Sequence, residues 1–255
     1  MPVADPGEPW DDVTQQIFGP NRDMALPPSK QMRGFWLNYQ SARFPDIGSD
    51  DDILATSTPH DLPVINTLAR AFAVSDTWCA SAPTETNPNR AFSLAGTSQG
   101  RKINCSFDGV PYTGLRTLFG VLNDANRSWK LYSDHYWLPL EELYFTQYMF
   151  PEGMEQGTFG SIDHFRRDVE NDDLPVFSYI EPAFFSEVGW PMPPIFGNDY
   201  HPPSSLYDGE GTLKRIYDIL IRNPDVFRKT LFIVTFDEHG GTYDHVPPGP
   251  CDVPP

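Results

Sequence analysis

The chain has 255 residues, of which 39% are hydrophobic and 14% aromatic, and 35 acidic against 18 basic side chains give a formal net charge of −17. This composition is typical of a globular protein with room for a large α/β domain and its core. The acidity excludes nucleic acid as the main partner, because nothing neutralises a phosphate backbone.

Membrane anchoring and a disulfide framework are also not expected. Residues 1–6 begin neither a signal peptide nor an anchor, and no apolar run is long enough for a transmembrane segment. Peripheral contact with a membrane and the cellular location stay open. The three cysteines, Cys79, Cys105 and Cys251, are too few for a disulfide framework, and their spacing matches no zinc site.

A helix followed by a strand is predicted four times along the chain. The helices are expected over 60–70, 114–126, 161–171 and 211–222, and the strands over 72–78, 129–132, 174–180 and 231–236. This rhythm predicts an α/β fold with a largely parallel sheet that helices cover on both faces.

The last predicted strand ends in a cluster of ionisable groups. Asp237, Glu238 and His239 follow an apolar, β-branched run and precede two glycines. Ligands collect beyond the carboxyl ends of such strands, and two carboxylates with an imidazole suit a hard divalent metal ion. The alternative, in which these charges only end a strand, is disfavoured because burying three ionisable groups without use is costly.

The other predicted strands also lead into polar loops. Thr84, Thr86 and Arg90 follow the first strand, and Glu181 follows the third. Right-handed crossovers bring such loops to one edge of the sheet. A threonine hydroxyl needs a base or a metal to become a nucleophile, and on spacing alone both threonines read as turn residues beside prolines.

Two histidines lie in loops that could serve the same site. His201 precedes the fourth helix, where an imidazole could donate to a phosphoryl oxygen, although spacing alone does not separate it from a surface histidine. His245 follows the double glycine and stands next to Asp244, where it could orient metal ligands from outside.

Four segments together resemble a known family. They are residues 5–16, residues 75–98, residues 178–182 with 199–203, and residues 235–248, the last with the sequence Thr-Phe-Asp-Glu-His-Gly-Gly-Thr-Tyr-Asp-His-Val-Pro-Pro. They resemble the phosphoesterase family of bacterial and fungal phospholipases C and related acid phosphatases, in the alkaline phosphatase superfamily. The resemblance covers essentially the whole chain and implies an alkaline-phosphatase-like fold.

The resemblance implies hydrolysis of phosphoric esters, of a phospholipid or of a phosphorylated small molecule. Thr86 takes the position of the nucleophile, which would form a covalent phospho-enzyme. One divalent metal ion of unknown identity is implied, with Asp237, Glu238 and Thr86 as its ligands. His201 and His239 fall at positions that steady the phosphoryl group or assist the leaving oxygen. The substrate-binding positions are Asn89, Arg90, Glu181 and His245.

Two departures from the family pattern set the remaining expectations. Glu8 stands where the family has an active-site histidine, and the family's N-terminal Glu-Asn metal block has no counterpart here. We therefore expect residues 1–255 to form a single but partial phosphoesterase domain, lacking an N-terminal strand and a C-terminal part. Full-length relatives are typically exported.

Three other functions stay open. One is a catalytically inactive relative that keeps the fold, and another is an acid phosphatase acting on monoesters. The third is a metallohydrolase with Asp237, His239 and His245 as ligands, which would form no covalent intermediate.

Overall fold

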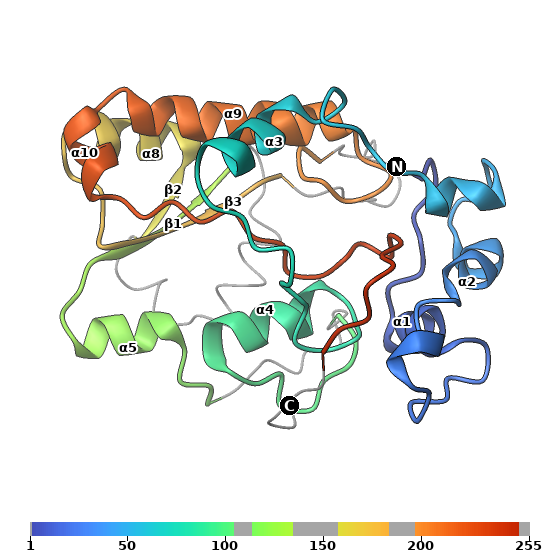
Figure 1. The fold of residues 1–255 in the computed structure, drawn as a ribbon. Coiled ribbons are helices and arrows are strands. Elements are labelled where there is room, and N and C mark those ends of the chain that lie inside the picture. Colours follow the sequence, from blue (N-terminus) through green and yellow to red (C-terminus); the bar gives the residue numbers. More distant parts are fainter. Residues whose placement is uncertain (1, 105–113, 135–157, 184–196, 250–255) are drawn as a thin grey trace, which may run out of the picture. The chain divides into compact units, whose positions relative to one another are not determined.

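The computed structural model describes residues 2–104, 114–134, 158–183 and 197–249 (Figure 1). The chain divides into two compact units. The first comprises Met1–Asp61, Phe72–Val110 and Thr235–Pro255, and the second comprises Leu62–Ala71 and Pro111–Val234. Among the described residues, we find no helix that combines the length and the apolar character needed to cross a bilayer.

The first unit is helical. It contains α1 (Trp10–Phe18), α2 (Phe35–Ala42) and α4 (Thr86–Ala95), with short 3-10 helices η1 (Pro28–Lys30) and η2 (Asp50–Leu54). Apolar residues of the N-terminal segments form its core, because α1 and α2 turn their apolar sides toward one another. The buried members are Ala4, Val13, Ile17, Met32, Phe35, Tyr39 and Ile53.

A close backbone approach joins α1 to α2. A Cβ at Gly34, the residue before α2, would overlap the carbonyl oxygen of Gln15 in α1. Only glycine fits such an approach without displacing one helix. The position of α2 on α1 therefore depends on Gly34.

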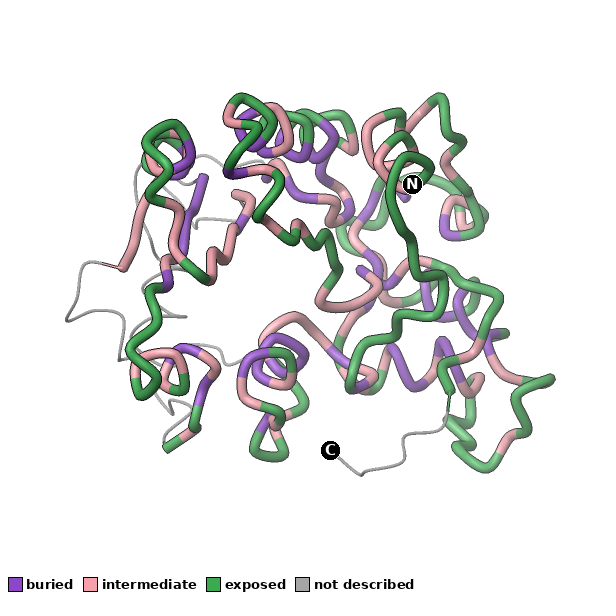
Figure 2. The backbone as a smooth tube through the Cα atoms, turned by 60° about the vertical axis from the view of Figure 1, so that its left-hand side comes forward, coloured by how far each residue is buried: buried purple, intermediate pink, exposed green. Residues whose placement is uncertain are grey.

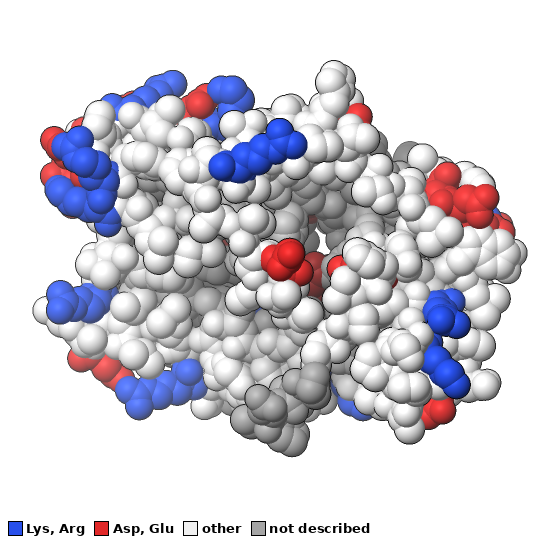
Figure 3. Space-filling model, viewed as in Figure 1, with Lys and Arg blue, Asp and Glu red and all other residues white. Residues whose placement is uncertain are grey.

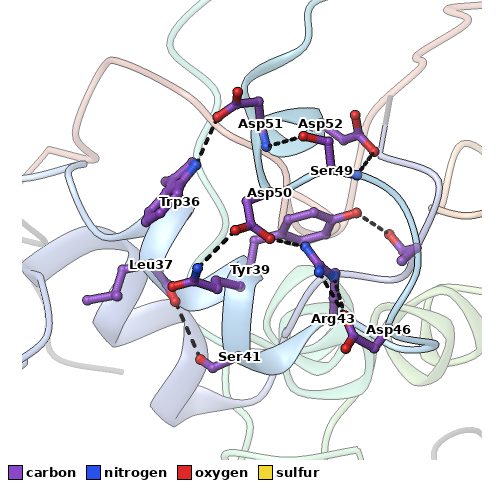
Figure 4. A network of polar contacts seen from close by, with 12 residues as sticks. Trp36, Leu37, Tyr39, Ser41, Arg43, Asp46, Ser49, Asp50, Asp51 and Asp52 are labelled. Atoms are coloured by element: carbon purple, nitrogen blue, oxygen red, sulfur yellow. Dashed lines mark hydrogen bonds and ion pairs between the residues drawn. The ribbon is translucent and has the colours of Figure 1, made fainter.

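Polar contacts fasten η2 to α2 (Figure 4). Trp36 Nε1 donates to Asp51 Oδ1 at 3.0 Å, and the Arg43 guanidinium binds the carboxylates of Asp46 and Asp50. The Ser49 side chain caps η2 by accepting from the Asp51 N–H at 3.3 Å. These contacts satisfy the ends of two short helices that have little propensity to form alone.

The second unit is built on a parallel sheet. Its strands β1 (Trp129–Ser133), β2 (Phe159–Ser161) and β3 (Phe177–Glu181) lie in the order β2-β1-β3. In the register, Leu131 of β1 is opposite Phe159 of β2 and Tyr179 of β3. The sheet is accompanied by α3 (Pro63–Ala71), α5 (Leu118–Asp124), α8 (Ile162–Glu170), α9 (Leu206–Ile221) and α10 (Pro224–Lys229).

Helices of the second unit cover both faces of this sheet. Successive residues of β1 point to opposite faces. On one face Trp129 packs against Phe119 of α5, with ring centroids 4.3 Å apart, and on the other Tyr132 packs against Phe165 of α8 at 5.2 Å. Tyr132 belongs to a buried cluster with residues of α8, α9 and α10. Buried and exposed residues alternate along the helical turns of the backbone (Figure 2). The predicted α/β class with a parallel, helix-covered sheet is confirmed.

Two of the four predicted strands are wrong. Residues 72–78 and 231–236 lie outside any strand, although their sequences are apolar and β-branched. In the second segment Phe232 packs against the core of the second unit, while Leu231 and Ile233 are 83% and 68% exposed. A strand needs a hydrogen-bonded neighbour as well as suitable side chains, and neither segment has joined the sheet.

Most of the lysine and arginine side chains gathered on α8, α9 and α10 (Figure 3) are paired with carboxylates. Arg166 pairs with Glu170, Lys214 with Asp218, and Lys229 with Asp172. Such exposed pairs contribute little to stability, but they neutralise one another. The positive charges of these side chains are therefore neutralised by neighbouring carboxylates of the same unit, and they do not form a basic surface for a nucleic acid.

Candidate active site

Helix α4 of the first unit carries Thr86 at its first residue and Arg90 one turn later. Residues four positions apart lie on the same face of a helix, so these two side chains share one side of α4. Thr86 is half-buried, and it lies where the unpaired N–H groups of the helix create a partial positive charge. An anionic group is favoured at such a position.

The loop before α4 is held by buried side chains. Asn89, which is 3% exposed, donates from Nδ2 to the carbonyl oxygens of Thr84 at 2.9 Å and Ala82 at 3.1 Å. The Thr84 hydroxyl is also buried and donates to the carbonyl oxygen of Lys102. Thr84 therefore serves the internal structure of the loop, which leaves Thr86 as the candidate nucleophile of the two.

Arg90 ties α4 to the loop that carries the acidic motif. Its Nε donates to Asp237 Oδ2 at 2.7 Å, and the two side chains are 7% and 26% exposed. Asp237 Oδ1 accepts from the N–H of Glu238 at 3.0 Å. A charge-assisted bond in a partly buried place is stronger than one at the surface, so it fixes the Asp237 carboxylate against Arg90 of α4.

The double glycine folds the acidic loop back on itself. The Gly240 N–H donates to Glu238 Oε2 at 2.6 Å, and the Thr242 hydroxyl donates to the carbonyl oxygen of His239 at 2.5 Å. Gly240 and Gly241 have φ of 59° and 63°, and a Cβ at Gly241 would overlap Pro6. Both glycines are thus required by conformation, and the second also by its contact with the N-terminal segment.

His239 is held by contacts on both ring nitrogens. Its Nε2 lies 2.8 Å from Gln16 Oε1 of α1, and its Nδ1 lies 3.3 Å from Glu238 Oε2. The ring of Phe35 packs edge-on against the imidazole, with centroids 6.0 Å apart. The imidazole is therefore fixed in orientation, with Nδ1 turned toward the carboxylate.

Carboxylates near α4 influence one another electrostatically. Burial raises the pKa of the Glu85 carboxyl, and the negative charges of Glu238 and Asp12 raise it further, against the opposing effect of the Asn104 N–H. Mutual repulsion of this kind favours either protonation or a bound cation. Within the same unit, Asp5 and Glu8 also bring carboxylate oxygens within 4.8 Å of one another.

The donors of the first unit suit a hard divalent cation. Asp237 and Glu238 offer carboxylate oxygens and Thr86 a hydroxyl, which are the ligand types of magnesium, calcium and manganese ions. The side chain of Glu238 is only 3% exposed, and a buried carboxylate needs positive partners. Because Gly241 packs against Pro6 and Gly7, the Asp5–Glu8 segment borders the same loop.

His245 lies apart from these contacts. Its side chain is 81% exposed, and its Nδ1 lies 3.3 Å from Asp244 Oδ1. It lines an open cleft together with Arg33, Met32 and Tyr243. The predicted metal-orienting or substrate-binding role of His245 stays a prediction.

In the second unit, Glu181 ends β3 in a buried polar cluster. It is 6% exposed and lies opposite Ser133 of β1. Next to it, Asp134 Oδ2 accepts from Asn198 Nδ2 at 2.6 Å and also pairs with the Arg215 guanidinium. These polar groups occupy the carboxyl ends of the parallel strands, where ligand-binding groups of α/β sheets collect.

The loop that carries His201 is anchored to α9. Tyr200 donates its hydroxyl proton to Glu210 Oε1 at 2.7 Å, and the same carboxylate accepts from the Ile65 N–H of α3 at 3.0 Å. Burial and the Glu210 carboxylate raise the pKa of Tyr200, so its hydroxyl stays a donor. The His201 N–H donates to Asp199 Oδ1 at 3.2 Å.

Sequence reasoning missed the polar residues that hold these side chains in place. Gln16 lies at the end of the first family-like segment without an expected role, and Asn38, Asn198 and Glu210 lie outside the four segments. One signal was available for Gln16, because it shares the buried side of α1 with Val13 and Ile17. A polar residue on such a side indicates an internal hydrogen-bond network.

Comparison with known proteins identifies relatives of the whole chain. A model of the phosphoesterase family matches residues 1–254. Non-specific phospholipase C3 of Arabidopsis thaliana is 31% identical over 256 residues, which cover 98% of this chain and 46% of that protein. Phospholipase C B of Mycobacterium tuberculosis is 29% identical over 237 residues, which cover 84% of this chain and 43% of that protein. The chain thus spans about half the length of the curated relatives it matches.

Proposed function

This chain belongs to the phosphoesterase family. From that premise we propose that it is a hydrolase of the phospholipase C type, which cleaves phosphoric esters with Thr86 as the nucleophile. The family match runs through both compact units, so we further propose that they belong to one phosphoesterase domain. The substrate class we propose is a phospholipid or another phosphodiester, which accords with the names of the relatives.

The observation that carries this proposal is the bond between Arg90 and Asp237. It joins the helix that begins at Thr86 to the acidic loop, within one compact unit. The nucleophile and the carboxylates that would hold a cation are therefore on the same side of α4. Proximity of this kind is a large part of catalysis, because it replaces an encounter between separate groups.

The proposed reaction has two steps, and in each step one bond to phosphorus forms while another breaks. The Thr86 oxygen forms a bond to phosphorus while the bond from phosphorus to the leaving oxygen breaks. The hydroxyl proton passes to solvent, and the leaving oxygen receives a proton from His239, which belongs to the same unit as Thr86. Water then attacks phosphorus, cleaves the phosphothreonine and restores the hydroxyl of Thr86.

The other residues bind and orient. The N-terminus of α4 stabilises the negative charge of the phosphoryl group, and Arg90 keeps Asp237 in place. A divalent cation held by Asp237, Glu238 and Thr86 would polarise a phosphoryl oxygen and lower the pKa of the hydroxyl when bound. For Asn89, Glu181 and His245 we propose contributions to substrate binding.

The test compares Thr86→Val with Thr86→Ser on a chromogenic phosphodiester and on the matching monoester. Valine keeps the shape of threonine without the hydroxyl, so turnover should be lost, while serine should retain part of it. Acid quenching during turnover should trap the phosphoryl group on Thr86 in the parent protein, as phosphate from the monoester and as an alkyl phosphate from the diester. Unchanged turnover by Thr86→Val would remove Thr86 from the mechanism, and hydrolysis without a trapped phosphate would favour a metallohydrolase.

The two substrates separate the related activities. Preference for the diester supports the phospholipase C type, whereas preference for the monoester identifies an acid phosphatase. A protein that binds the diester and never hydrolyses it, with or without added divalent ions, would be an inactive relative. That last result would overturn the proposed function.

A further inference from the structure

We propose that Gln16 is a positioning residue for His239, which fixes the orientation of the imidazole and keeps the hydrogen of the neutral ring on Nε2. The role of His239 in hydrolysis rests on the function proposed above, but the hydrogen-bond pattern that carries this inference does not. All the residues concerned belong to the first unit.

The orientation of the Gln16 amide follows from its other contacts. Its Nε2 donates to the carbonyl oxygen of Gly7 at 2.6 Å and to Asn38 Oδ1 at 2.8 Å. Both partners accept and neither donates, so a flipped amide would set its oxygen against two other oxygens. The Gln16 oxygen must therefore face His239, from whose Nε2 it lies 2.8 Å away.

Asn38 is oriented in the same way by a carboxylate. Its Nδ2 donates to Asp12 Oδ1 at 2.7 Å and to Gln15 Oε1 at 3.2 Å, which leaves Oδ1 to accept from Gln16. An ionised carboxylate only accepts hydrogen bonds. Asp12 thus determines which group donates and which accepts in each hydrogen bond of the series that links Asn38, Gln16 and His239.

The consequence for His239 concerns the tautomer. An oxygen that can only accept requires a hydrogen on Nε2, and a hydrogen bond to one ring nitrogen decides which nitrogen carries the proton. Nδ1, which lies 3.3 Å from Glu238 Oε2, is then the ring nitrogen that carries no hydrogen in the neutral imidazole. Without Gln16, the nearby carboxylate would favour a hydrogen on Nδ1 instead.

Burial gives the arrangement its rigidity. Gln16 and Asn38 are each 1% exposed, so water does not compete for their bonds. Both N–H bonds and the oxygen of Gln16 have partners, and breaking one such bond leaves a buried polar group unsatisfied. The edge-on ring of Phe35 further limits rotation of the imidazole.

The direct test is nitrogen NMR of the histidine rings in the metal-free full chain, with the His239 signals assigned by their loss in His239→Asn. At a pH where the ring is neutral, the parent protein should show the Nε2–H tautomer. In Gln16→Met, which has no amide oxygen, the population should shift toward Nδ1–H.

The kinetic arm measures what a merely structural role would not change. Gln16→Met should lower kcat about 10- to 100-fold with KM little changed, as the loss of a supporting partner does elsewhere. In a His239→Ala background, the same substitution should lower kcat no further. The matched control is Gln31→Met, which removes an amide of the same unit that binds the carbonyl oxygen of Leu26, and which should leave the His239 signals and kcat unchanged.

Either of two results would overturn the inference. One is an Nδ1–H tautomer of His239 in the parent protein, a measurement in which only the assignment of the signal depends on a variant. The other is an independent loss of kcat from Gln16→Met in the His239→Ala background. If the parent protein hydrolyses no ester, the proposed function fails while the NMR result still decides the role of Gln16.

Discussion

Arg90 and Asp237 lie 147 positions apart in the chain, yet their side chains form a salt bridge in which Nε donates to Oδ2 at 2.7 Å. Arg90 is almost fully buried and Asp237 is about three-quarters buried. This pair connects the helix that bears the candidate nucleophile with the acidic loop, and several expected outcomes depend on it.

Removal of Arg90 should destabilise the first unit. In Arg90→Met the Asp237 carboxylate loses its charged partner while remaining partly buried, so unfolding should become easier by about 1–3 kcal/mol. Urea unfolding followed by fluorescence measures the loss. The control is Arg116→Met, because the pair of Arg116 with Asp124 is 73% and 70% exposed and should contribute under about 1 kcal/mol. Equal effects of the two substitutions would contradict the structural role of the buried pair.

Substitution of Asp237 by asparagine should weaken metal binding more than it weakens the fold. The Asn oxygen still accepts from Arg90, but a neutral ligand replaces an anionic one, and calcium and magnesium affinities depend on the number of charged ligands. Calorimetric titration with each ion should show a loss of about tenfold or more. Asp244→Asn is the control, since that carboxylate is 62% exposed and pairs with His245. An unchanged affinity in Asp237→Asn would remove Asp237 from the proposed ligands.

A third outcome concerns the double glycine. Gly241→Ala combines a left-handed φ of 63° with overlap against Pro6, whereas Gly96→Ala meets only the strain of its φ of 73° in open space. Strain alone costs roughly 1 kcal/mol for a non-glycine residue. Thermal unfolding should therefore show a larger loss for Gly241→Ala than for Gly96→Ala. If the losses are equal, the contact with the N-terminal segment has no energetic importance.

The fourth prediction concerns the loss of folding stability at alkaline pH. Burial raises the pKa of Tyr132, and its hydrogen bond to Asp168, at 2.6 Å, raises it further. The phenol should therefore contribute stability that is fully present below pH about 10 and is lost as the pH rises above that value.

Tyr132→Phe removes this titration. Between about pH 9.5 and 11, its urea midpoint should fall less steeply than that of the parent protein, although the lost hydrogen bond costs about 1 kcal/mol at neutral pH. Tyr207→Phe, at a residue that is 73% exposed, should follow the parent curve. Identical slopes for all three proteins would contradict the assigned role of Tyr132.

The sequence predicted the elements that carry their own periodic signal. The helix expected over 161–171 is α8, and the strands expected over 129–132 and 174–180 are β1 and β3. Helix α8 also has its start signal, because Ser161 accepts from the His164 N–H at 3.4 Å. Where local pattern and tertiary context agree, sequence reasoning suffices.

Helices α1 and α4 were missed because prolines, which flank α1 and lie within α4, favour turns. Pro88 lies in the first turn of α4, where its missing N–H has no cost, so a segment that reads as a loop begins a helix. The strands over 72–78 and 231–236 failed for the opposite reason. Their composition suits a sheet, but strand formation depends on partners that local sequence does not specify.

Some residues of the candidate site could be predicted from the sequence, and the partners that hold them could not. The motif itself drew attention to Asp237, Glu238 and His239, whose residue types indicate metal and phosphoryl chemistry. The partners of these residues could not be inferred, because Arg90 and Gln16 reach the loop through contacts between distant parts of the chain. An amide or guanidinium that orients another side chain carries no signature of its own.

The discontinuity of the first unit has a consequence for biosynthesis. A ribosome delivers Pro111–Val234 as one uninterrupted stretch, but the first unit also needs Thr235–Pro255, which emerges later than its other two parts. The sheet-containing unit can thus assemble while translation continues, since domains fold as units as they are made. Helix α4 waits more than a hundred codons for Asp237, so the bond between Arg90 and Asp237 can form only after the second unit has been synthesised.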